Sequence, residues 1–210
     1  MKPRVYFFGI AILTFMMAPC AGAVDTLYQI MQRMQSDKAV RISYRETRTL
    51  ELMDKPWHGS GYMYSLPPNL MIMEQLKPER LLMAVKGEQM FYFDPANDVR
   101  HQDEMSDDNP LSLNIGLFRA LMNADLRMLF HLYQVDFKSS GHGWFMTLKP
   151  KRQGDSGFSV VISGSAQKPA EKITIRQPDG DFSEFSLKPD TTAHDVEVTV
   201  NRLYRELLGE

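Results

Sequence analysis

Residues 61–95 constrain the fold more than any other part of the chain, because they hold four short apolar runs that each end in turn residues. Runs of this length bounded by Pro, Gly and Asn are typical of an antiparallel meander. We therefore predict four consecutive antiparallel strands, Gly61–Leu66, Leu70–Gln75, Arg80–Lys86 and Gln89–Asp94.

These runs are apolar at consecutive positions, as in Met71-Ile72-Met73 and Leu81–Val85. A sheet with one face in water alternates apolar and polar residues instead. Both faces of this meander should therefore be covered. We expect helices on one face and an apolar cavity along the other.

Helical spacing predicts helices before and after the meander. An apolar stripe at Leu27, Ile30, Met31 and Met34 predicts a first helix that begins at Asp25 or Thr26. A helical pair is predicted over Pro110–Leu132, with Pro110 at its first position, a break near Asn123, and Asp125 capping the second helix. The tail is ambiguous, because Val196, Val198 and Val200 alternate like a strand whereas Val200, Leu203, Tyr204 and Leu207 are spaced like a helix.

Further apolar runs predict additional strands. A long strand begins at Val40 and carries Ile42 and Tyr44 on one face, and Asp179-Gly180 is a hairpin signal. The remaining strands are expected at Val99–Gln102, Tyr133–Lys138, Trp144–Leu148, Phe158–Ser163, Lys172–Gln177 and Phe182–Leu187. With about nine to eleven strands and three or four helices, we predict an α+β fold, an antiparallel sheet with helices gathered on one side.

Residues 1–23 read as a secretory signal peptide, with Lys2 and Arg4 before an apolar stretch and Ala21-Gly22-Ala23 as the cleavage site. The apolar stretch is too short to span a bilayer comfortably. The alternative is a lipoprotein anchored through Cys20, but Pro19 stands where lipidation needs a small residue. We predict export to the periplasm, with residues 24–210 forming a single domain.

Composition excludes several classes of function. Cys20 is the only cysteine, so the chain without its signal would contain no disulfide and no thiolate metal site. The net charge is −2. Loss of Lys2 and Arg4 makes it about −4, which argues against nucleic acid as a partner and against a polybasic membrane anchor.

No catalytic or metal-binding motif is apparent. No two of the five histidines have the i, i+3 or i, i+4 spacing of a helical metal pair. The chain lacks a nucleophile elbow, a phosphate loop and a dinucleotide fingerprint. The acidic run Asp103–Asp108 does not have the spacing of a calcium loop. We expect no metal, no cofactor and no enzymatic activity.

Methionine is the distinctive residue type of the predicted sheet. Met63, Met71, Met73 and Met83 lie in three successive predicted strands, and the period of two places Met71 and Met73 on one face. Methionine suits surfaces that accept ligands of varying shape, because it is flexible and polarizable. The alternative is ordinary core packing. Aromatic area on nearby strands comes from Tyr62, Tyr64, Phe91 and Phe93.

The order of these features resembles the periplasmic outer-membrane lipoprotein carrier LolA and its relatives. The matching features are an exported signal, an amphipathic helix, a strand with Tyr44 and Glu46, a Gly-led strand that ends in Pro67-Pro68-Asn69, and Lys86-Gly87 before an aromatic strand that closes at Pro95. The match is tight from Tyr44 to Pro95, and its specificity lies in the conjunction of motifs. Pro67 replaces the family's Arg before Pro-Asn, which ties the lid shut, so the chain looks like a divergent, LolA-related member.

The resemblance implies an incomplete antiparallel β-barrel covered by helices, with an apolar cavity that shelters acyl chains between them. It also implies an inner-membrane donor, an outer-membrane acceptor and a monomeric carrier. The lid would be the helical pair Pro110–Leu132. The residues expected to bind lipid are Tyr44, Met63, Met71, Met73, Met83, Phe91, Phe118 and Met122.

Three functions remain open from the sequence. The leading hypothesis is a soluble periplasmic carrier of acylated cargo, either a lipoprotein or another lipid such as an acyl or polyene lipid. The second is a structural or interaction module of the cell envelope whose barrel is filled by its own side chains and holds no ligand. The third is an exported hydrolase. A continuous cavity beneath the lid would favour the carrier.

Overall fold

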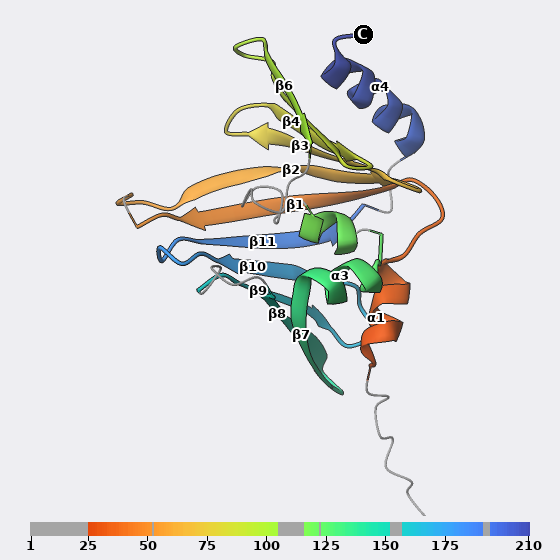
Figure 1. The fold of residues 1–210 in the computed structure, drawn as a ribbon, viewed down its shortest axis with the longest axis vertical. Helices are drawn as coiled ribbons and strands as arrows, with labels where there is room; N and C mark the ends of the chain where they lie inside the picture. Colours follow the sequence, from red (N-terminus) through yellow and green to blue (C-terminus); the bar gives the residue numbers. More distant parts are fainter. Residues whose placement is uncertain (1–24, 52, 105–115, 122, 152–156, 191–193) are drawn as a thin grey trace, which may run out of the picture.

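The computed structural model describes residues 25–51, 53–104, 116–121, 123–151, 157–190 and 194–210. Its eleven strands form one antiparallel sheet in the order β6-β5-β4-β3-β2-β1-β11-β10-β9-β8-β7. The strands are β1 (Val40–Thr49), β2 (Trp57–Leu66), β3 (Leu70–Lys77), β4 (Leu81–Lys86), β5 (Gln89–Asp94), β6 (Val99–Glu104), β7 (Tyr133–Ser140), β8 (Gly143–Pro150), β9 (Ser159–Ser165), β10 (Lys172–Arg176) and β11 (Phe182–Pro189). Because β6 and β7 do not pair, the sheet is open, and the predicted α+β fold with an incomplete barrel is confirmed (Figure 1).

Local sequence signals set the ends of the helices. Helix α1 (Leu27–Met34) starts at Thr26, whose side chain accepts from the Gln29 amide while the Gln29 side chain accepts from the Thr26 amide, a capping box. Helix α3 (Leu126–Leu132) is capped by Asp125, which accepts from the Met128 amide at 2.9 Å. Both caps agree with the sequence prediction. The predicted start at Pro110 lies outside the described residues, and residues 116–121 are helical.

The tail forms helix α4 (Val196–Leu208). The helical spacing therefore predicted its structure, and the strand-like alternation of the valines did not. Val200, Leu203 and Leu207 are buried, whereas Val198 is 67% exposed. This result follows from packing, because α4 can bury its stripe only against a face of the sheet that is itself apolar.

Two apolar cores lie on opposite faces of the sheet. The inner face carries the larger core, where α1, residues 116–121 and α3 pack on strands that include Met63, Met146 and Ile173. The outer face carries a smaller core, made by α4 on β2 to β5. The prediction that the helices gather on one side is therefore wrong: α4 lies across the sheet from α1 and α3 (Figure 1).

An ion-pair network fixes α4 to the outer face. Arg80 donates to Glu74 at 3.0 Å and to Glu206 of α4 at 2.5 and 3.0 Å. Tyr64 donates to the other Glu74 oxygen at 3.2 Å. The hydrogen bond from Arg80, helped by its positive charge, lowers the pKa of the Glu206 carboxyl. Burial raises the pKa of Tyr64 to about 12, and the nearby Glu74 charge adds to the effect.

Candidate functional site

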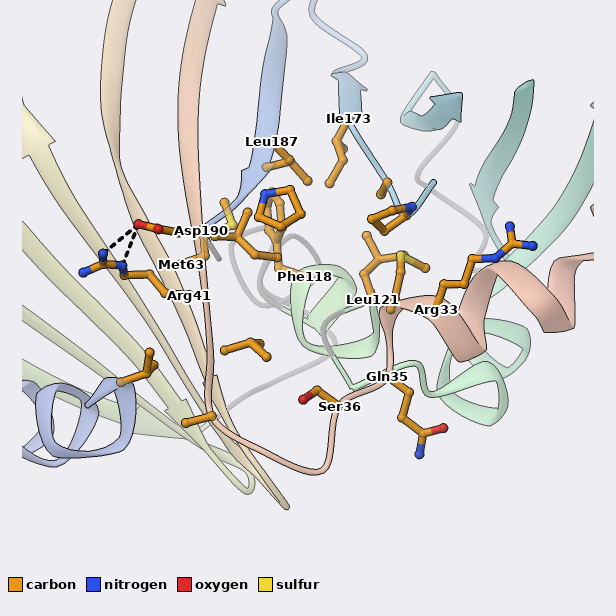
Figure 2. Close-up of a pocket in the computed structure, with 18 residues that line it drawn as sticks. Arg33, Gln35, Ser36, Arg41, Met63, Phe118, Leu121, Ile173, Leu187 and Asp190 are labelled. Atoms are coloured by element: carbon orange, nitrogen blue, oxygen red, sulfur yellow. Dashed lines mark hydrogen bonds and ion pairs between the residues drawn. The ribbon is translucent and has the colours of Figure 1, made fainter. Parts of the chain in front are cut away.

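An apolar cavity of about 330 Å³ opens between α1, the start of β1 and the lid (Figure 2). We use the term lid for residues 116–121 and 123–132. The lining residues are Arg33, Met34, Gln35, Ser36, Ala39, Val40, Arg41, Ile42, Met63, Phe118, Leu121, Pro169, Ala170, Ile173, Leu187, Pro189, Asp190 and Val196. This volume lies at the lower end of the range for ligand pockets, about 300–1,000 Å³.

Four adjacent strands supply the wall of the cavity. Ile42 of β1 pairs with Met63 of β2, which places the two side chains beside each other on the inner face. Leu187 of β11 and Ile173 of β10 continue this wall. The cavity thus lies where β1 joins β11, strands that are far apart in the sequence.

The lid supplies the opposite wall through Phe118 and Leu121. The Phe118 ring meets the Phe185 ring edge-on at 5.1 Å between centroids, and the ring centroids of Tyr44 and Phe185 lie 6.1 Å apart. Figure 2 shows Phe118 and Leu121 pointing toward the strands that carry Met63 and Leu187. These ring contacts hold the lid against the inner face while leaving the cavity beside it.

Arg119 and Asn123 tie the lid to the meander, at the β4–β5 turn and near the end of β2. Arg119 donates to the backbone carbonyl of Gly87 in the β4–β5 turn, and its other nitrogen lies 3.5 Å from the sulfur of Met128. The Ser65 hydroxyl lies 3.3 Å from the Asn123 side-chain oxygen. An arginine that belongs to the lid therefore fastens it to the meander.

Charged groups stand at the rim of the cavity. Arg41 donates through two nitrogens to one oxygen of Asp190, at 2.6 and 3.0 Å. Arg33 donates to Asp25 at 2.7 Å, and the Gln167 amide donates to the same carboxylate at 2.9 Å. The hydrogen bond from Arg33, helped by that from Gln167, lowers the pKa of the Asp25 carboxyl. The rim is therefore polar and paired, while the interior is apolar.

Of the predicted lipid-binding residues, Met63 and Phe118 line the cavity. Met71 belongs to the same inner core, Met73 packs against it, and Met83 pairs with Met73 in the register. Tyr44 is buried in this core beside Phe185, and its hydroxyl has no hydrogen-bond partner among the described residues. Burial raises the pKa of that phenol.

Phe91 lies on the other face, which corrects its placement among the cavity residues. Its ring meets Tyr204 of α4 edge-on at 5.6 Å, within the outer core. Residues on one strand alternate between faces, so Phe91 belongs with Ala84 and Ile72 rather than with the methionines. Met122 lies outside the described residues.

The sequence prediction missed most of the wall, namely Ile42, Leu121, Ile173 and Leu187. Ile42 had a usable signal, because it alternates with Tyr44 along β1. No local sequence signal marked Ile173 and Leu187. Only the pairing of β1 with β11 and of β11 with β10 brings them to the same face as Met63.

Among the described residues, no group of three or more His, Cys, Asp and Glu side chains could hold a metal ion. Within the same residues, no helix has the length and apolar character needed to cross a membrane. His58 and His101 are exposed on strands and contact Thr47 and Tyr92 respectively.

No protein-family model matches the chain, and no curated protein matches it. Several solved structures, however, are similar to it. A DUF1329 family protein from Desulfovibrio piger aligns with a TM-score of 0.50 and 11% identity over 84% of this chain and 96% of that one. At this identity the likeness shows a shared fold only.

Two further solved structures are also similar to this chain. One is a putative outer membrane lipoprotein-sorting protein domain from Vibrio parahaemolyticus, with a TM-score of 0.45 and 10% identity over 85% of this chain and 97% of that one. The other is a LolA superfamily protein from Nitrosomonas europaea, with a TM-score of 0.42 and 8% identity over 77% of this chain and 90% of that one.

Proposed function

We propose that this protein is a soluble carrier that shelters an acyl chain in the cavity between the lid and β1, β2, β10 and β11. The observation that carries the proposal is the cavity itself, an apolar space bounded by Phe118, Leu121, Ile42 and Met63. A barrel filled by its own side chains would leave no such space, because protein interiors pack densely.

Energetics favour reversible binding. Each buried methylene stabilises a complex by about 0.8 kcal/mol, so eight methylenes would contribute about 6 kcal/mol. The loss of translational and rotational freedom offsets at least about 4 kcal/mol of this gain. A cavity of this size should therefore hold an acyl chain weakly enough to release it, as a carrier must.

The cellular location of the carrier and its partners are part of the same proposal. Removal of residues 1–23 after export would leave the single domain 24–210 in the periplasm, where it would take acylated cargo from an inner-membrane donor to an outer-membrane acceptor. The polar rim around Arg41 and Arg33 would keep the head of such a cargo in water while its chain enters the cavity. Binding and release of this kind need no catalytic group.

Displacement of a fluorescent fatty acid tests the proposal. In the variant Ile42→Trp, the larger side chain should fill the cavity and weaken binding about ten-fold or more, since each lost methylene contact costs about 0.8 kcal/mol. The matched control is Val161→Trp, which places the same ring on the outer face of β9. Equal affinity in the two folded variants, or no binding by the unaltered protein, would refute an acyl-binding cavity here.

A further inference from the structure

A second hollow lies on the outer face of the sheet, on the opposite side from the acyl cavity. This outer groove has a volume of about 500 Å³ and is formed by β1, β2 and β11. Ser43 and Arg45 of β1 pair with Lys188 and Ser186 of β11, and Arg45 also pairs with Ser60 of β2. The register therefore gathers two cations and three serine hydroxyls around one hollow.

Among the described residues, no acidic side chain pairs with the two cations of the outer groove. Neither Arg45 nor Lys188 has an ion pair among the described residues, and both are exposed. The cations beside them are already paired, because Arg41 contacts Asp190 at 2.6 Å and Lys172 contacts Glu184 at 2.6 Å. An unpaired positive patch in a chain of net charge −2 attracts anions.

The other lining groups fit a phosphate. Ser60 and Ser186 flank Arg45 in the register, and neither hydroxyl has a hydrogen-bond partner in the described part of the chain. A guanidinium presents parallel N–H donors that match two phosphate oxygens, and hydroxyl and ammonium groups can serve the remaining oxygens. Leu76, 42% exposed, adds an apolar edge to the same hollow.

We propose that the outer groove binds the phosphate group of an anionic ligand through Arg45, Lys188 and the hydroxyls of Ser60 and Ser186. The phosphate can belong to a small soluble ester or to the headgroup of a lipid in a bilayer. This site is independent of the proposed carrier function, because the sheet separates it from the acyl cavity.

The test uses the full chain without its signal and two probes, glycerol 1-phosphate and vesicles of phosphatidylcholine with or without phosphatidylglycerol. Binding of the ester is measured by calorimetry and binding of vesicles by flotation. Saturable binding of either probe supports the site. Binding of the ester alone assigns the groove to a soluble phosphate, and binding that needs phosphatidylglycerol assigns it to a lipid headgroup.

The variant Arg45→Gln/Lys188→Gln should weaken that binding at least about ten-fold, because two charge-assisted contacts are lost. The matched control is Lys149→Gln, which removes an exposed cation from β8 on the same outer face and should change binding less than about two-fold, the expectation for a distant screened charge. The proposal is overturned if neither probe binds, or if the control weakens binding as much as the double variant. Displacement of a fluorescent fatty acid should be unchanged in both variants, which separates this result from the carrier proposal.

Discussion

The outer face of the sheet differs between two halves: it is exposed over β7 to β10 and covered by α4 over β2 to β5. Strands β7 to β10 alternate, as in β8, where Trp144, Met146 and Leu148 are buried and Phe145 and Lys149 are exposed. In β3 both faces are buried over Leu70–Ile72, because α4 covers the outer side. The consecutive apolar positions of the meander therefore reflect a helix on each side rather than a cavity along one face.

This difference explains where the cavity lies. The half with both faces buried carries α4 on its outer side, and the lid reaches it through the hydrogen bonds from Arg119 to Gly87 and from Ser65 to Asn123. The cavity opens at the junction of the halves, where β1 meets β11 and where the inner face is apolar but incompletely filled. In the proposed carrier this region would open for cargo, and regions that open belong to the less stable parts of a fold.

The largest expected effect concerns the helix that distinguishes the two halves. Leu203→Ala on α4, a fully buried residue, should lower the free energy of unfolding by about 2–5 kcal/mol. Urea unfolding measures it. Val198→Ala on the exposed side of the same helix should change it by less than about 0.5 kcal/mol. Similar losses from both would mean that α4 does not pack as described.

Removal of Arg80, the centre of the ion-pair network, should lower the free energy of unfolding by less. Arg80→Met would leave the buried Glu74 without its cation and cost about 1–3 kcal/mol of stability. Arg202→Met, which removes an exposed arginine 3.6 Å from Glu206, should cost at most about 0.5 kcal/mol. A negligible loss in Arg80→Met would show that apolar contacts alone hold α4.

Acid should slightly weaken the attachment of α4 to the sheet through Arg80 and Glu206. Because the folded-state pKa of Glu206 lies below its ordinary value of 4.5, the ion pair contributes fully above that pH and its contribution is lost as the pH falls through the lowered pKa. Glu206→Gln should therefore be less stable than the unaltered protein at pH 6, and the gap should shrink toward pH 3. Thermal unfolding at both pH values measures it, and a gap that grows on acidification would contradict this assignment.

Local signals predicted the elements well, because they act over a few residues. Thr26 and Asp125 cap helices as expected, and the turns of the meander fall where Pro67, Gly87 and Pro95 end the strands. These features depend on backbone preferences that the neighbouring sequence already determines.

Long-range pairing determined what could not be predicted. Phe91 and Met71 both lie in apolar strands, and only the position of α4 shows that they serve different cores. Ile173 and Leu187 reach the cavity through the pairing of β1 with β11, which joins Ile42 to Pro189. No local pattern encodes that register.

The carrier proposal is tested most directly by one substitution on each face of the sheet, Phe118→Ala in the lid and Phe91→Ala under α4. Both rings are largely buried, at 7% and 4% exposure, and each makes an edge-on aromatic contact. Fluorescent fatty-acid displacement and urea unfolding are measured on both variants.

We expect Phe118→Ala to weaken fatty-acid binding about ten-fold, because it removes a wall of the cavity and with it about 1–2 kcal/mol of apolar contact, and to leave the sheet folded. Phe91→Ala should lower stability by about 3–5 kcal/mol, the usual cost of a buried Phe, and leave affinity unchanged. If Phe118→Ala destabilises the protein as steeply as Phe91→Ala and leaves affinity unchanged, Phe118 is ordinary core and the carrier account is contradicted.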